Sequence, residues 1–371
     1  MANLFAAIDD LIKCATASGS MDDLQKAIGG VHDVLESASP EQRNESLRRL
    51  NAALPKMHPF PACKVAMTCG AIVEFGGDPQ ITGLGLFPLL LNTLPGAAKF
   101  HQLCEEKARA DGLLKDGDDD DAPTADELFQ KYIRTIYQEN PAAAFAAMGE
   151  QDISLAAIAH LSRSKQLRAE ARRFPKLLQQ SLAYDRACRA GHRFLTKMLL
   201  VLDDEPMLVL DTDQHKGFKI TFSGVPDNFT LHTCLMGTLI GDPREGWIEA
   251  IGFDLEPVRR AMGHVCGDNA PSLTGAFNLW NWTGLQPDGT LPAGQLEGAH
   301  WIWNEGVPAD IAPFDGMRVV ILGPPPYDRH WRGGLLFSGM APELVVTEKL
   351  PESAVKEWLQ KLAAAAQAKE S

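Results

Sequence analysis

The stretch DDEPMLVLDTDQHKGFKITF, residues 203–222, separates two halves of the chain that differ in sequence pattern. It holds two short apolar runs, at 207–210 and 218–222, joined by the polar segment 211–217. Short apolar runs bounded by turn residues are typical of strands that pair as a hairpin. We therefore predict an α+β domain over residues 201–371, with a mixed or antiparallel sheet.

The residues before this stretch carry a helical pattern. Apolar residues recur every three or four positions, as on the face formed by Leu4, Ile8 and Leu11. Ser20, Ser39 and Thr124 precede apolar-periodic segments and are typical N-capping residues. Predicted helices begin roughly 20 residues apart, so a pair spans about 40 residues, the period of HEAT or armadillo repeats. A plain helical bundle has the same spacing. We therefore predict an all-helical domain over 1–200 that is either a helical repeat or a bundle.

An acidic run, DGDDDD at 116–121, interrupts the helical pattern. Like charges repel and none of them can be buried, so we predict a solvated acidic loop at about 115–123. The run lacks the ordered ligand spacing and the terminal glutamate of a calcium-binding EF-hand. We also expect the helix after 76–77 to open at Asp78-Pro79 and to bend at Pro88.

In the second half, strand and helix patterns alternate irregularly. We predict helices at 228–240, at 254–262 and from 351 to the end of the chain. Further strands are predicted at 276–282, 300–304, 318–322 and 343–347. The segment GPPP at 323–326 is stiff and predicts that residues 327–332 project as a fixed loop.

The charge distribution is uneven. The chain has a net charge of −13, which argues against nucleic acid as a partner of the whole surface. Residues 163–197 nevertheless carry ten basic and two acidic side chains. This segment predicts either an anion-binding surface through Arg168, Arg172 and Arg173 or helices that pack beside acidic parts of the same chain. No aromatic residues alternate with the basic ones in the manner of single-strand binders.

Tryptophan is concentrated in one region, because five of the seven lie between residues 280 and 331. In two places a pair is separated by one residue, so on a strand both rings of a pair share a face. If the strands are neighbours, the four rings meet and form either a cleft wall for a flat or sugar-like ligand or a buried core face. The four are Trp280, Trp282, Trp301 and Trp303.

Polar residues surround these tryptophans. A cleft with an aromatic floor and converging polar groups is the usual form of a ligand site. The candidate polar ligand-binding residues are Asn278, Asn304, Tyr327 and Arg329. For catalysis, Glu305 is the candidate general base and His300 or His330 the candidate acid. A glycosidase-like pair would need Asp310 or Asp315 as its second carboxylate, and neither stands at a telling spacing.

A zinc site is a remote alternative. His232-Thr-Cys234 and His264-Val-Cys266 together offer two histidines and two cysteines, the ligands of a tetrahedral zinc site. In extended structure each pair shares a face, whereas on a helix the two side chains diverge. Because we predict a helix at 228–240, we predict no metal. The sequence contains no standard nucleotide, metalloprotease or hydrolase motif and identifies no cofactor.

The sequence also leads to an expected cellular compartment and an expected function. The N-terminus lacks the basic start of a signal peptide and no apolar run spans a bilayer, so we expect a cytoplasmic protein with no membrane partner. We predict a binding or interaction protein, with a helical surface for a protein partner and a tryptophan-lined cleft for a small polar ligand. The alternative is a hydrolase or transferase that acts on a small polar substrate at 278–332. Anion or nucleic-acid binding through 163–197 is a weaker alternative.

Overall fold

The computed structural model describes residues 3–17, 20–114, 122–189, 194–263, 265, 267–292, 300–325 and 327–370. The chain divides into two compact units, Met1–Leu199 and Leu200–Ser371. The first is helical and the second combines a mixed sheet with helices, which confirms the predicted fold class. The predicted acidic loop lies, at residues 115–121, outside the described residues.

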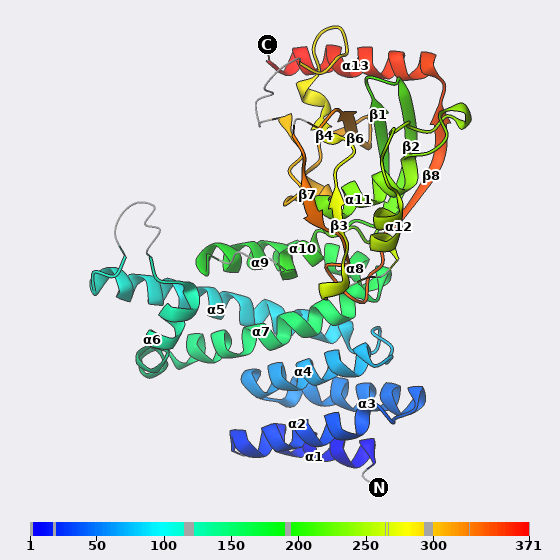
Figure 1. Ribbon diagram of the computed structural model, residues 1–371. Helices are drawn as coiled ribbons and strands as arrows, with labels where there is room; N and C mark the ends of the chain where they lie inside the picture. Colours follow the sequence, from blue (N-terminus) through cyan, green and yellow to red (C-terminus); the bar gives the residue numbers. More distant parts are fainter. Residues whose placement is uncertain are drawn as a thin grey trace. The chain divides into compact units, whose positions relative to one another are not determined.

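The N-terminal unit consists of helices in its described part. Figure 1 shows the first four stacked in chain order. With the short 3-10 helix η1 (Leu54–Lys56), the helices are α1 (Leu4–Thr16), α2 (Met21–Leu35), α3 (Pro40–Ala53), α4 (Pro59–Glu74), α5 (Gly83–Ala110), α6 (Ala125–Glu139), α7 (Pro141–Ser162), α8 (Lys165–Arg172), α9 (Pro175–Ala187) and α10 (Phe194–Leu199).

Local capping explains where several of these helices begin. Ser20 accepts a hydrogen bond from the Asp23 backbone at the start of α2. Reciprocal capping boxes start α3, through Ser39 and Gln42, and α6, through Thr124 and Glu127. These bonds satisfy backbone N–H groups that the first helical turn leaves without intrahelical partners. The predicted caps at Ser20, Ser39 and Thr124 are thus confirmed.

The predicted start of the fifth helix at 78–79 is wrong. Asp78 accepts a hydrogen bond from the Gln80 backbone at 2.9 Å and forms a turn, so that α5 begins only at Gly83. Pro88 and Pro95 both lie inside α5. Since proline cannot donate a backbone hydrogen bond, α5 is held by its packing against α7 and α9 as well as by its own ladder.

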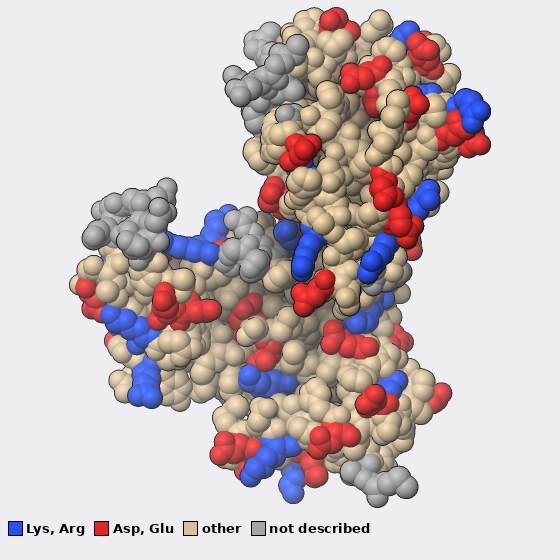
Figure 2. Space-filling view, in the orientation of Figure 1, with Lys and Arg blue, Asp and Glu red and all other residues tan. Residues whose placement is uncertain are grey.

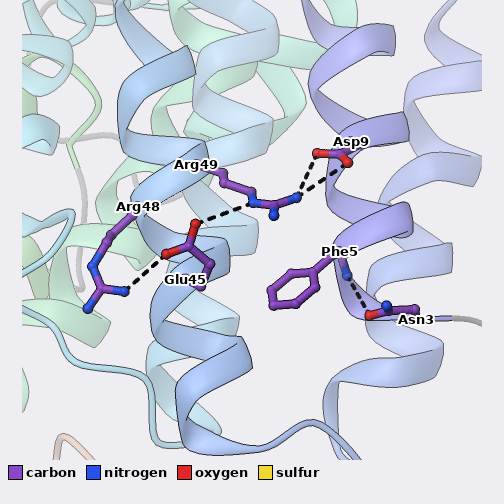
Figure 3. Close-up of polar contacts among 6 residues, drawn as sticks. All are labelled: Asn3, Phe5, Asp9, Glu45, Arg48 and Arg49. Atoms are coloured by element: carbon purple, nitrogen blue, oxygen red, sulfur yellow. Dashed lines mark hydrogen bonds and ion pairs between the residues drawn. The ribbon is translucent and has the colours of Figure 1, made fainter.

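An ion-pair network on the surface joins α1 to α3 (Figure 3). Arg49 pairs with Asp9 at 3.2 Å and with Glu45 at 3.5 Å, and Arg48 pairs with the same glutamate at 3.1 Å. The Arg49 guanidinium also lies 4.6 Å from the centre of the Phe5 ring. Each exposed pair is worth little, about 0.2–1 kcal/mol, so the network orients the two helices more than it stabilises them.

The C-terminal unit is built on a mixed sheet with the order β4-β6-β1-β2-β8, in which β5 also pairs with β6. The pair β1–β6 is parallel and the other pairs are antiparallel. The predicted hairpin at 207–222 is β1–β2. The strands of this sheet are β1 (Glu205–Asp211), β2 (Lys216–Ser223), β4 (Asn278–Asn281), β5 (Pro313–Phe314), β6 (Met317–Gly323) and β8 (Glu343–Leu350).

Helices cover both faces of this sheet. On one face Met207 and Val209 of β1 pack in a core with α11 (Asn228–Leu239) and α12 (Glu256–Met262). On the other face Leu208 and Leu210 pack against α13 (Glu352–Glu370), which runs across the strands (Figure 1). This alternation along β1 is the period of two that a strand imposes on its side chains.

The region around the tryptophans differs from the prediction. Residues 300–304 form no strand and contribute only a single bridge, between Trp301 and Trp280. The predicted strand at 276–282 is shorter, because a 3-10 turn, η4 (Trp282–Gly284), follows β4. Part of the predicted projecting loop is the strand β7 (His330–Arg332), which pairs with β3 (Ser272–Thr274) in a separate two-stranded sheet.

Within the described residues, no helix has both the length and the apolar composition needed to cross a membrane.

Candidate functional site

The four paired tryptophans do not form one wall. Trp280 and Trp282 are each 1% exposed and pack in the core under α13, so they cannot serve as ligand-binding residues in an open cleft. The η4 turn directs Trp282 onto Phe314, and its indole N–H donates to the Ala312 carbonyl at 3.2 Å. Trp303, in contrast, is 54% exposed.

Trp301 connects the core rings to the surface. Its ring centre lies 5.4 Å from that of Trp280, at nearly a right angle, and 5.6 Å from that of Trp303. The ring of the exposed Tyr327 also lies near Trp301, with 6.1 Å between the two ring centres. Edge-to-face and tilted pairs at these distances are favourable for aromatic rings. The cluster therefore runs from the interior to the surface and ends in an exposed indole.

A cavity of about 130 Å³ lies beside the two outer indoles, and we call it the indole hollow. Segment 301–306 forms one side because it is tied to the start of α11: the Asn228 backbone donates to the Gly306 carbonyl at 3.0 Å, and the Asn228 amide donates to the Trp303 carbonyl at 2.8 Å. The lining residues are Asn228, Asn281, Trp301, Ile302, Trp303, Gly306, Asp310 and Ile311.

Three polar atoms of the hollow's lining lack a partner among the described residues. They are Asn228 Oδ1, Asn281 Oδ1 and Trp301 Nε1, and all three are shielded from solvent. The bond from the Asn228 amide to the Trp303 carbonyl fixes which end of that side chain is the acceptor. A buried polar atom without a partner costs about 1–3 kcal/mol. Three residues that line the hollow thus hold two acceptors and one donor that the described part of the chain does not satisfy, and a small shift of their side chains would present these atoms to a ligand.

A larger hollow of about 400 Å³ in the same unit is different in this respect. Asp227 lines it but caps α11 by accepting from the Thr230 backbone at 2.8 Å. Thr233 accepts from the Trp331 indole at 3.1 Å and donates to the Phe229 carbonyl at 2.9 Å. Because its polar groups already have partners, this hollow is the weaker candidate for a polar ligand.

A buried polar cluster occupies the interior of the unit. Its central residue, His232, lies between the rings of Phe277 and Trp331, at 5.2 and 4.8 Å. Burial, and secondly the charge of Arg329, lowers the pKa of His232 to about 3, although the Asn304 side chain and the Phe277 backbone favour the protonated ring. The imidazole is therefore neutral at physiological pH.

The predicted ligand residues Asn278 and Asn304 belong to this interior cluster and do not line the indole hollow. Arg329 donates to Asn278 Oδ1. Asn304 is 1% exposed, and neither end of its amide forms a hydrogen bond of normal geometry with a described residue; the same holds for both ring nitrogens of His232. These residues shape the interior beneath the surface and do not reach a ligand in the hollow.

The predicted catalytic residues are not brought together. Glu305 is exposed, and His300 lies against Gly284. His330 is exposed on β7, where its Nδ1 lies 3.1 Å from the Thr274 hydroxyl. No hydrogen bond or ion pair in the described part of the chain joins any two of the three. An acid and a base must both reach one substrate, so the geometry lends the catalytic hypothesis no support.

The basic segment 163–197 makes contacts within its own unit. Arg168 is only 4% exposed and donates to the Leu161 carbonyl at 2.6 Å, so it cannot be part of an open anion site. Arg173 pairs with Glu170 at 2.9 Å, and Arg172 lies on the exposed side of α8. Basic and acidic residues are interspersed over the N-terminal helices on the face in Figure 2. These contacts favour the intramolecular interpretation of the segment.

The structure gives no support to the alternative of a zinc site. His232 and Cys234 both lie on α11, as predicted, and both are buried. The other pair, His264 and Cys266, lies outside the described residues. Among those that are described, no three histidine, cysteine or acidic side chains gather as metal ligands would.

The fold and the hollow define a helical unit joined to an α+β unit with a small, partly aromatic cavity. No protein-family model, curated protein or solved structure matches the chain. The site therefore has to be interpreted from its own geometry.

Sequence reasoning identified only part of the hollow. Trp301 and Trp303 were candidates, and Asp310 was considered as a second carboxylate. Asn281 lies between two tryptophans, which was a usable signal. Asn228 lies more than 50 residues earlier, at the first position of a helix. Nothing in its local sequence distinguishes it from an ordinary asparagine near a helix start.

Proposed function

We propose that the chain is a binding protein and that its C-terminal unit holds a small polar ligand in the indole hollow. One observation carries the proposal: three solvent-shielded polar atoms without described partners belong to residues that line a single cavity beside an exposed indole. A ligand that pairs with them would remove the cost of leaving them unsatisfied.

The lining favours a hydroxylated, sugar-like ring. Two amide oxygens require donors and one indole N–H requires an acceptor, and a hydroxyl group supplies both. The exposed face of Trp303 offers an apolar surface for the C–H face of such a ring. The hollow measures about 130 Å³, slightly less than a cavity of roughly 150 Å³ that holds benzene, so it would take one edge of a sugar ring while the rest of the ring lies over the exposed Trp303.

Calorimetric titration of the full chain with glucose, galactose and N-acetylglucosamine tests this proposal. We expect saturable binding of at least one sugar, weakened about tenfold or more in Asn281→Ala and Trp303→Ala, since each removes a contact worth about 1–2 kcal/mol. Trp247→Phe is the matched control, because Trp247 stacks on Phe218 and does not line the hollow. If none of the three sugars binds, or if the variants bind as tightly as the parent chain, the proposal is wrong.

We also propose that the helical unit presents a surface to a protein partner, in a cytoplasmic setting. Stacked helices form extended surfaces of the kind that interaction scaffolds use. The buried, reduced thiols of Cys63, Cys69 and Cys104 support a reducing compartment. Co-purification of one defined protein with the full chain, lost when the α1–α4 surface is altered by charge-reversing substitutions, tests the partner surface.

A further inference from the structure

A second cavity lies within the N-terminal unit, where α4, α5 and α7 meet. Its volume is about 520 Å³, which is in the range of about 300–1,000 Å³ that is usual for small-molecule sites. It is lined by His58, Pro59, Phe60, Cys63, Asn92, Thr93, Gly96, Lys99, Asn140, Pro141, Ala142, Ala143, Phe145 and Ala146. None of these residues belongs to the unit that holds the indole hollow.

The walls of this cavity are mostly apolar. The rings of Phe60 and Phe145 lie 5.6 Å apart on its side, and Phe145 also contacts Tyr137 at 5.3 Å. These contacts hold the aromatic wall in place without filling the cavity. The small residues of α7 that line the cavity, such as Ala142 and Ala146, leave the space open.

The floor is polar but already satisfied. The Cys63 thiol and the Thr93 hydroxyl are both buried and lie 3.7 Å apart, within hydrogen-bond distance for sulfur. Burial raises the pKa of Cys63 to about 11, so the thiol stays neutral and is a poor nucleophile. The cavity is therefore suited to binding an apolar group and not to covalent chemistry.

The rim of the cavity carries one formal positive charge. Among the described residues that line the cavity there is one lysine, Lys99, and one histidine, His58, but no carboxylate, although the chain as a whole carries −13. The Lys99 ammonium lies 3.7 Å from the Glu106 carboxylate, a loose and exposed pair. Helices α4 and α7 both begin at this rim, and no side chain caps α4. The positive ends of two helices add to the charge of the lysine.

We propose that this cavity binds a monocarboxylate with an apolar body, such as a medium-chain fatty acid. The apolar chain would lie against Phe60 and Phe145, and the carboxylate would lie at the rim beside Lys99. An apolar interior with a single cationic edge matches that chemistry and does not match a cation or a highly polar molecule.

Calorimetric titration of the full chain with decanoate, and separately with decanol, tests the proposal. We expect decanoate to bind one site per chain and more tightly than decanol. Lys99→Gln should weaken decanoate binding about threefold, the effect of losing one exposed ion pair, and leave decanol binding unchanged. Ala142→Leu, at an exposed lining position, should reduce binding of both by filling the mouth of the cavity.

Lys13→Gln is the matched control, because Lys13 is an exposed lysine on α1 that does not line the cavity. Thermal unfolding of each variant establishes that it is folded. If neither decanoate nor decanol binds, or if Ala142→Leu leaves both affinities unchanged, the cavity is not the site. If Lys99→Gln weakens decanol as much as decanoate, the rim does not select an anion and the proposal fails.

Discussion

Asn304 is the residue whose burial is hardest to explain by packing alone. Its side chain is 1% exposed, and its amide forms no hydrogen bond of normal geometry with any described residue. Its backbone carbonyl is used, because it accepts from the Phe229 backbone at 3.1 Å and ties segment 301–306 to α11. The backbone of Asn304 thus helps to hold the segment that forms one side of the hollow, whereas its buried amide interacts with the His232 ring.

We expect Asn304→Leu to raise the free energy of unfolding by about 1 kcal/mol, because leucine has a similar size and replaces a buried amide whose two ends form no hydrogen bond of normal geometry with a described residue. Urea denaturation at neutral pH measures this change. Asn140→Ala is the contrasting variant: Asn140 caps α7, accepting from the Ala143 backbone at 3.1 Å, and its loss should cost about 1 kcal/mol. Destabilisation by Asn304→Leu would mean that the amide has a partner in solution.

At the scale of elements, the close packing of α4 on α7 depends on glycine. A Cβ atom at Gly70 would lie 3.0 Å from the Ala156 backbone, and one at Gly149 would lie 3.0 Å from the Cys63 side chain. Contacts this short are tighter than van der Waals packing allows, so the helices would have to move apart. Gly29 in α2, in contrast, has nothing within 4 Å of its Cβ position.

This contrast predicts opposite effects of the same substitution. Gly29→Ala should stabilise the chain by up to about 1 kcal/mol, because alanine is the better helix former and meets no neighbour. Gly70→Ala should destabilise it by about 1–2 kcal/mol, since overpacking outweighs the gain in helix propensity. The urea concentrations at which the two variants and the parent chain are half unfolded measure both effects. Equal stabilisation by both would show that α4 and α7 are not in close contact at Gly70.

Elements were predicted best where local signals specify them. The capping residues Ser20, Ser39 and Thr124 marked true helix starts, because a cap acts within three residues. The strand predicted at 300–304 did not form: Trp301 packs against Trp280, Trp303 is exposed, and the backbone of the segment bonds to the start of α11. The alternation of tryptophans in the sequence is the same for a strand and for an irregular segment, so periodicity cannot distinguish the two.

At the scale of the whole molecule, each unit has a deeply buried neutral histidine among its described residues, His160 in the first and His232 in the second. His160 in α7 donates from Nδ1 to the Ala156 carbonyl at 2.7 Å, so its Nε2 accepts from the Thr82 hydroxyl at 2.6 Å. Burial lowers its pKa to about 4, and the pKa of His232 in the other unit falls to about 3. Both side chains must be neutral for the native packing.

Acid should therefore destabilise the chain through these histidines. The unfolded state takes up protons below pH 6.5 and the native state only near pH 4 or 3, so the free energy of unfolding falls as the pH drops through this window. For His160 alone the loss between pH 7 and pH 5 should be about 2 kcal/mol. Urea denaturation at both pH values should show a smaller loss in His160→Gln. An unchanged pH dependence in that variant would contradict this assignment.

The sequence by itself determined the helical half, the α+β half and the position where one pattern replaces the other, because helix periodicity, caps and apolar runs act over neighbouring residues. Only the tertiary structure decided which indoles are sealed in the core and which face a cavity. It also brought Asn228 next to Trp301 and Trp303, although helix α11 and segment 301–306 are far apart in the chain. Whether a buried polar atom finds a partner depends on such long-range packing, and no local pattern encodes it.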